Sequence, residues 1–212
     1  PPYRYVWSIR PGFAFVNTVL YGERMTTDQL SVTDWLKQGL KTLTTSGFVA
    51  LKAEPLAKAM GVSRGSFYWH FADVAAFHAA LLDYWREVAA ERVIAALETE
   101  GRSEDALRRL IRTAFGTRLA TEAAIRGWAM HEPLARNAVD AIDRRRVSYI
   151  ASLLEKSGWP PSRATAQAQI LYWAFVGFTL SDRQLARKQQ QNATAELIRI
   201  VAPQGRRQSG KV

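Results

Sequence analysis

The stretch Gly61-Val62-Ser63-Arg64-Gly65 fits the G-x-S-x-G pattern in which a hydrolase exposes a nucleophilic serine. That chemistry needs a β-strand leading into the serine, because the strained strand-to-helix turn is what exposes the hydroxyl. Residues 53–60 are instead a helix-favouring octet without β-branched residues, and the chain offers no set of strand patterns for an α/β sheet. Only one histidine, His131, precedes a carboxylate. We therefore expect no catalytic residue and a protein that is not an enzyme.

The same stretch also fits the turn between two DNA-binding helices. Ala57 is small where two helices must cross closely, and Gly61 is free to adopt the left-handed conformation of the turn. Ser63 then becomes the N-cap of the next helix, residues 64–71, where its hydroxyl would stabilise the helix by ~1 kcal/mol. This interpretation accounts for more positions than the hydrolase elbow does.

The helical wheel of residues 64–71 separates two faces. Phe67 and Phe71 fall together on the inner face, while Tyr68 and Trp69 point outward. Exposed aromatic side chains favour a surface that a partner covers, although both could instead pack on the following helix. Gly65 costs the helix ~1 kcal/mol relative to alanine, which suits a backbone that closely approaches a duplex.

The rest of the chain predicts an all-α protein, because apolar residues recur at helical spacing nearly throughout. A first helix is expected to begin near Ser31 or Thr33 and to end at Gly47. Asp73 is expected to cap a long helix directly after the aromatic helix, so that a three-helix head joins the remainder without a linker. The expected helices after the first are 53–60, 64–71, 73–98, 103–120, 121–130, 134–157, 162–187 and 192–202.

The composition limits the compartment and the partners. The 212 residues include no cysteine, which is typical of a reducing compartment such as the cytoplasm, and no apolar run approaches the ~20 residues that cross a bilayer. The formal net charge is +10, with most of the excess near the C-terminus. We expect residues 205–212 to be a basic mobile tail. The hypothesis for residues 1–24 is a translated leader or N-terminal extension ahead of a native start at Met25.

The segment from Val32 to about Trp85 resembles the TetR (tetracycline-repressor-like) family of bacterial transcriptional regulators. "GVSRGSFYWHF" is similar to the recognition-helix signature of that family, and "PLAKAMGVS" before it and Asp-x-x-x-Phe after it follow the family's order. The resemblance implies an N-terminal helix-turn-helix domain, residues 27–75, joined by a long helix to a larger ligand-binding and dimerisation domain, residues 76–204. It also implies a homodimer whose paired heads read a palindromic double-stranded DNA operator, and a small-molecule effector that releases it.

The resemblance implies a set of DNA-contacting residues around the aromatic helix. By position these are Lys52, Arg64, Gly65, Ser66, Tyr68, Trp69 and His70. Two positions depart from the family. Ala53 and Glu54 stand where a hydroxyl cap and a basic residue are frequent, and Val74 stands where lysine is common. Losing these phosphate contacts should weaken nonspecific DNA affinity.

The second half of the chain carries a helix, residues 162–187, that is apolar on nearly every side. Such a helix must be buried all round, so we expect it to form a dimer interface together with the last helix, unless a thick monomer core covers it. A small-molecule pocket typically mixes apolar bulk with a few polar groups. The candidate lining residues, each of which could also be ordinary core, are Trp128, Met130, His131, Tyr149, Tyr172 and Phe175.

Two further patterns have simple interpretations. His131-Glu132 is not a zinc site, because the protease motif would need a histidine where Ala135 stands, so we expect no metal and no cofactor. The run Arg144-Arg145-Arg146 could bind a phosphate or an acidic partner, but pairing with Asp140 and Asp143 along the same helix is the stronger interpretation.

Together these patterns predict a homodimeric, ligand-responsive DNA-binding repressor in the cytoplasm. The alternative is a helical interaction protein of the same shape that responds to a protein partner or to no ligand.

Overall fold

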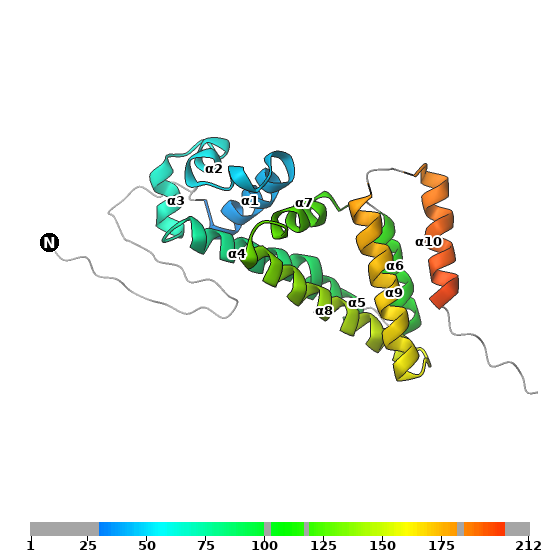
Figure 1. Ribbon diagram of the computed structural model, residues 1–212. Coiled ribbons are helices and arrows are strands. Elements are labelled where there is room, and N and C mark those ends of the chain that lie inside the picture. Colours follow the sequence, from blue (N-terminus) through cyan, green and yellow to red (C-terminus); the bar gives the residue numbers. More distant parts are fainter. Residues whose placement is uncertain (1–29, 100–102, 117–118, 182–184, 202–212) are drawn as a thin grey trace, which may run out of the picture. The chain divides into compact units, whose positions relative to one another are not determined.

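The computed structural model describes residues 30–99, 103–116, 119–181 and 185–201 (Figure 1). The chain divides into two units, Pro1–Ser31 and Val32–Val212, and the fold described below belongs to the second. The described residues form helices and no strand, which confirms the all-α prediction. The expected leader at residues 1–24 and the expected tail at residues 205–212 lie outside the described residues.

The head of this unit is a small helical cluster built around aromatic side chains. It consists of α1 (Val32–Ser46), the 3-10 turn η1 (Phe48–Ala50), α2 (Ala53–Ala59) and α3 (Arg64–His70). Trp35 and Phe67 are fully buried and meet edge to face, with ring centroids 5.5 Å apart. The predicted inward orientation of Phe67 and Phe71 is confirmed, since both are buried. This aromatic core fixes the orientation of α3.

A continuous helical path leads from the head into the body of the unit. It comprises α4 (Val74–Arg86), a π-helical segment η2 (Glu87–Glu91) and α5 (Arg92–Thr99). The predicted cap is confirmed, because Asp73 Oδ1 accepts a hydrogen bond of 2.7 Å from the amide of Ala76. The sequence pattern predicted one unbroken α-helix here and gave no sign of the π-helical segment.

The head and α4 approach each other closely at Gly39 of α1. A Cβ atom at this position would come within 2.7 Å of Phe77 Cζ and 2.9 Å of Leu81 Cδ1. Only glycine therefore allows α1 to lie this close to α4, and the packing couples the head directly to the first turns of α4.

Five more helices lie in the described part of the body. They are α6 (Ser103–Gly116), α7 (Ala120–Ala129), α8 (Pro133–Lys156), α9 (Pro161–Leu180) and α10 (Arg187–Val201). The long helix α8 packs against α4, α6, α7 and α9, and α10 packs against α6 (Figure 1). Trp159 Nε1 donates a hydrogen bond of 3.2 Å to the carbonyl of Val201, which holds the last turn of α10 near the start of α9.

Three boundaries in this half differ from the predicted ones, and the first is the helix expected at 103–120, which ends at Gly116. The helix expected at 162–187 ends at Leu180, because Ser181 adopts extended backbone. The last helix begins at Arg187 rather than near 192. No helix in the described ranges has the length and apolar character needed to span a bilayer.

Candidate DNA-binding surface and inner cavity

The turn between α2 and α3 has the geometry that its residues predicted. Gly61 has φ +69°, in the left-handed region, and the amide of Val62 donates to the carbonyl of Ala57 at 3.0 Å. Ala57 is buried, so its small side chain lets the two helices approach. The turn therefore sets α3 across α2 in a helix-turn-helix arrangement.

Ser63 occupies the N-cap position of α3 as predicted, but the prediction that its hydroxyl accepts a capping hydrogen bond is wrong. The side chain makes no capping hydrogen bond. The carbonyl of Ser63 accepts from the amide of Ser66 at 3.0 Å instead. The residue before the cap lies in a turn and not in a strand, so the strained elbow of a hydrolase does not form here.

The outward face of α3 carries the predicted aromatic pair. Trp69 is 77% exposed and Tyr68 is 43% exposed. Arg64 Nη2 donates to the Tyr68 hydroxyl at 3.2 Å, with the guanidinium 5.5 Å from the ring centroid. The hydrogen bond from Arg64 fixes the direction of the phenol, and the cation is left on the solvent side of the helix.

The other candidate DNA contacts lie around this pair. Gly65 is exposed, and a Cβ there would meet only Ser63 Oγ at 3.6 Å, so the backbone is open to a close approach. Lys52 is exposed at the N-cap of α2. Ser66 and His70 are half-buried, and the His70 ring tilts against Trp35 with centroids 6.3 Å apart. The structure thus brings all seven candidates to the α2–α3 region, with Ser66 and His70 at its inner edge.

A second connection joins the head to the body besides α4. Thr44 Oγ1 of α1 lies 3.3 Å from Thr121 Oγ1 of α7, within hydrogen-bonding distance. The Phe48 ring stacks on His131, with ring centroids 6.1 Å apart. His78 of α4 hydrogen-bonds the carbonyl of Leu51 at 2.9 Å. The head is therefore held by α7 as well as by its covalent link to α4.

An apolar cavity of about 340 Å³ lies inside the body. Its wall comes from η2, α5, α6, α7, α8 and α9, from Trp85 of α4, and from one residue of the head, Leu40 of α1. Three of the predicted pocket residues line it: Tyr149, Tyr172 and Phe175. The inner cavity is thus in direct contact with the DNA-binding head.

The other three predicted pocket residues lie outside the wall of this cavity. Trp128 is buried and its ring packs edge to face on His78, with centroids 5.1 Å apart. Met130 is 74% exposed. His131 is also exposed and stacks on Phe48. These three residues surround the junction between the head and α7.

Sequence reasoning missed most of the wall. Trp85 and Ile94 are buried and line the cavity, but apolar residues at helical spacing do not distinguish the wall of a cavity from a filled core. The available signal was three alanines on helices whose neighbours are bulky, Ala89, Ala90 and Ala114, which leave the space unfilled.

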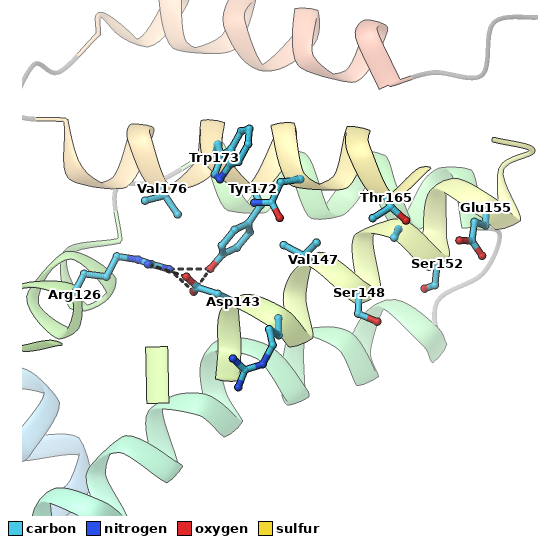
Figure 2. A pocket seen from close by; sticks show the side chains of 13 residues that line it. Arg126, Asp143, Val147, Ser148, Ser152, Glu155, Thr165, Tyr172, Trp173 and Val176 are labelled. Atoms are coloured by element: carbon cyan, nitrogen blue, oxygen red, sulfur yellow. Dashed lines mark hydrogen bonds and ion pairs between the residues drawn. The ribbon is translucent and has the colours of Figure 1, made fainter. Parts of the chain in front are cut away.

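A buried network of charges forms one end of the cavity wall. Glu122 is 2% exposed, and its Oε1 accepts from Arg126 Nε and Arg146 Nη1, each at 3.0 Å. Arg126 Nη2 also donates to Asp143 Oδ1 at 2.7 Å, and the Tyr172 hydroxyl bonds the same carboxylate (Figure 2). The network links α7, α8 and α9.

The acidic partners in this network raise the pKa values of its two arginines, Arg126 and Arg146. Burial opposes the charge of Arg146, but attraction to Glu122 and its hydrogen bonds outweigh burial and raise the pKa of the guanidinium. In Arg126 burial is again the largest influence and acts to lower the pKa, while Asp143, Tyr172 and Glu122 together raise it. Burial raises the pKa of the Tyr172 phenol, so this side chain stays neutral. Both arginines therefore remain cations inside the body.

The run Arg144–Arg146 does not pair along its own helix as expected. Arg145 Nε and Nη2 bind the two carboxylate oxygens of Glu91 at 3.1 and 3.2 Å. Arg146 turns inward to Glu122 and also donates from Nη2 to the carbonyl of Ala89 at 3.0 Å. The expectation is wrong because side chains of α8 face η2 and α7 here, and the cross-helix carboxylates lie closer. Two consecutive arginines thus hold the π-helical segment.

A second, more open hollow of about 660 Å³ lies on the outer side of the same network, between α8 and α9 (Figure 2). Its wall includes Arg126, Asp143 and Tyr172, so the network separates it from the inner cavity. Trp173 lies at this groove and is 65% exposed.

Comparison with known proteins identifies the head. Residues 36–81 match the model of the bacterial regulatory proteins of the tetR family. The head is therefore similar to the DNA-binding part of the tetR-family regulators. The matched residues include α2, the turn at Gly61 and α3, so the match covers the same helices as the helix-turn-helix geometry.

Solved structures share the fold of this chain over most of its length. The reduced form of Escherichia coli NemR is 21% identical and has a TM-score of 0.68, with 81% of this chain and 97% of that one covered. A candidate regulator from Saccharomonospora viridis, in complex with choline, is 14% identical with a TM-score of 0.63, covering 79% and 95%. AibR in complex with isovaleryl coenzyme A and operator DNA is 14% identical with a TM-score of 0.61, covering 79% and 97%. The comparison with curated proteins returned no match.

Proposed function

We propose that this chain is a TetR-family transcriptional regulator, a homodimeric repressor of the cytoplasm that leaves a palindromic operator when a small, largely apolar ligand fills the inner cavity. The observation that carries the proposal is the position of Leu40. This residue belongs to α1 of the DNA-binding head and also lines the cavity. A ligand there touches the head and the α4–η2–α5 path at the same time.

Operator binding is supported by the surface of α3. Arg64, Tyr68 and Trp69 are exposed, and Gly65 leaves the backbone open beside them. Aromatic and guanidinium groups on one helix can contact base edges and phosphates in a major groove. AibR, which shares the fold, was solved with operator DNA. We propose that Lys52, Ser66 and His70 complete this set.

Ligand binding is supported by the size and chemistry of the cavity. Its volume of about 340 Å³ lies at the lower end of the range of small-molecule sites, and nearly all of its wall is apolar. Two proteins of similar fold were solved in complex with small molecules, choline in one and isovaleryl coenzyme A in the other, which supports a ligand role for this chain. A small apolar molecule fits this chain best.

Dimer formation is supported by the outer face of α9. Ile170, Trp173 and Leu180 are 53%, 65% and 49% exposed, in a stripe along one side of the helix. A stripe of large apolar side chains is typical of an interface. We propose that a second copy covers α9 and the adjoining groove of α8. The packing of α10 on α6 supports a smaller part for the last helix than the sequence suggested.

The mechanism follows from linkage between the two sites. Two half-sites about 34 Å apart tolerate little change in the separation of the heads. A ligand that prefers the released arrangement by ~5.5 kcal/mol shifts the population from 1:99 to 99:1. Contacts with Leu40 and with Val88 of η2 would supply that preference, since both residues line the cavity.

The test begins with selection of an operator from random duplexes and a thermal-shift screen of apolar compounds. We expect compounds that stabilise the protein to lower its operator affinity. Ala114→Trp fills the cavity and should abolish this response while preserving operator binding, because Ala114 lies in the wall far along the chain from α3. If stabilising compounds leave operator affinity unchanged, ligand release is wrong. If no duplex is selected, the alternative of a protein-binding helical module is favoured.

A further inference from the structure

Given the ligand role proposed above, we infer that the inner cavity takes an electrically neutral ligand, and that the Glu122–Arg146 pair in its wall excludes charged ones. The inference concerns the chemical class of the ligand, which the size and apolar character of the cavity leave open.

The charge on the cavity wall is confined to one pair. Among the residues that line the cavity, only Glu122 and Arg146 are ionised, and every other lining side chain is apolar, a threonine or a tyrosine. Arg146 Nη1 and Nη2 bind Glu122 Oε1 and Oε2, each at 3.0 Å, in a two-pronged contact. The wall therefore presents a closed ion pair and no single charge.

The bonding capacity of this pair is already used. Glu122 Oε1 accepts a second bond from Arg126 Nε, while Arg146 Nη2 also donates to the carbonyl of Ala89. The charge of Arg126 is in turn balanced by Asp143, 2.7 Å away. The network holds two guanidinium groups and two carboxylates, so its net charge is zero.

A charged ligand would disrupt this balance. An anion in the cavity must draw Arg146 away from Glu122, whose carboxylate is 2% exposed and would be left without its bidentate partner. A cation must displace Arg146 in the same way. An unpaired charge in such surroundings is far more costly than in water, because few dipoles are there to solvate it. A neutral molecule leaves the pair intact.

The test uses three probes of nearly the same shape: 2-naphthylmethanol, which is neutral, 2-naphthoate and 2-naphthylmethylammonium. Their binding to the full chain is measured by calorimetry at pH 7.5, with Ala114→Trp as the variant whose cavity is filled. We expect the alcohol to bind about tenfold or more tightly than either ion, since the neutral probe avoids the cost of an unpaired charge. Loss of the signal in Ala114→Trp places binding in the cavity.

A variant reverses the preference. Glu122→Gln keeps the shape of the side chain and leaves the network with one excess positive charge, so naphthoate should become the tightest of the three probes. Glu155→Gln makes the same change on the exposed side of α8, away from the cavity wall, and should leave the order unchanged. Circular dichroism tests whether each variant is folded. If Glu122→Gln does not fold, the order of affinities of the three probes for the unchanged chain still tests the inference.

The outcomes separate the two proposals. Tighter binding of either ion to the cavity of the unchanged chain would overturn the inference and leave ligand-dependent release standing. Preferential binding of the alcohol without any change in operator affinity would support the inference and contradict the release mechanism. If none of the three probes binds, the inference is overturned, and ligand-dependent release is decided by the screen of apolar compounds.

Discussion

Trp69 and Phe67, two residues apart on α3, have opposite environments. Trp69 is 77% exposed, whereas Phe67 is fully buried against Trp35 and Phe77. An aromatic side chain in water contributes little to the folded state, so the exposed one is available for recognition. The buried one holds the helix in place.

We expect Trp69→Ala to lower affinity for the selected operator at least tenfold, since base-contacting residues are worth ~1–3 kcal/mol each. The free energy of unfolding should change by less than about 0.5 kcal/mol, as is usual for exposed positions. Competition between specific and random duplexes measures the first quantity and urea denaturation the second. Phe67→Ala is the matched control, which should cost ~3–5 kcal/mol of stability. Unfolding of Trp69→Ala would show that this ring belongs to the core.

The buried carboxylate of Glu122 should contribute strongly to the stability of the folded chain. Glu122→Ala removes the shared partner of Arg126 and Arg146 and should lower the free energy of unfolding by ~3–5 kcal/mol, because two buried cations lose their carboxylate. Asp83→Ala breaks an exposed pair with Arg86 and should cost less than about 1 kcal/mol. Equal losses in urea denaturation would contradict the burial argument.

The sequence predicted the outward residues of α3 better than the cavity wall, and the reason is physical. The orientation of Tyr68 and Trp69 follows from the periodicity of one short helix, which is local information. The partners of Arg145 and Arg146 depend on the distance between α8, η2 and α7, which no spacing along the chain encodes. The same is true of Trp128, whose burial could not be assigned to the cavity or to the head junction.

At the scale of whole helices, the contact of α1 with α4 depends on one glycine. Gly39→Ala places a methyl group 2.7 Å from Phe77 Cζ, so the helices must separate or the rings must move. We expect this change to lower the free energy of unfolding by ~1–3 kcal/mol, as overpacking does. Gly127→Ala on α7 meets nothing within 4 Å and should raise it by up to ~1 kcal/mol through helix propensity. Thermal melts of the two variants should shift in opposite directions, and shifts in the same direction would argue against a close contact at Gly39.

Most helices were predicted within a few residues, because caps and glycines mark their ends. Asp73 begins α4 and Gly47, with φ +74°, follows the end of α1. The π-helical segment Glu87–Glu91 was not predicted, since its apolar spacing differs little from that of an α-helix. Its stabilising contacts, Arg145 with Glu91 and Arg146 with Ala89, come from α8.

For the molecule as a whole, the exposed stripe on α9 predicts the state of assembly. Trp173→Glu should convert the proposed dimer to a folded monomer, because a charge cannot be buried unpaired in an apolar interface. Sedimentation velocity measures the mass, and circular dichroism the helix content. Met130→Glu changes an equally exposed apolar residue at the end of α7 and should leave the dimer intact. A dimer that survives Trp173→Glu would place the interface elsewhere.

The contact between Thr44 and Thr121 restricts how the head can move. A rigid object that is attached at one point can turn about any axis through that point. A rigid object that is attached at two points can turn only about the line that joins them. The head is joined to the body at its covalent link into α4 and again where α1 meets α7. While both attachments hold, the head keeps a single rotational degree of freedom. We therefore expect any ligand that acts through Leu40 to rotate the head about the same axis whatever its shape, and to differ from other ligands only in the sense and the extent of the rotation.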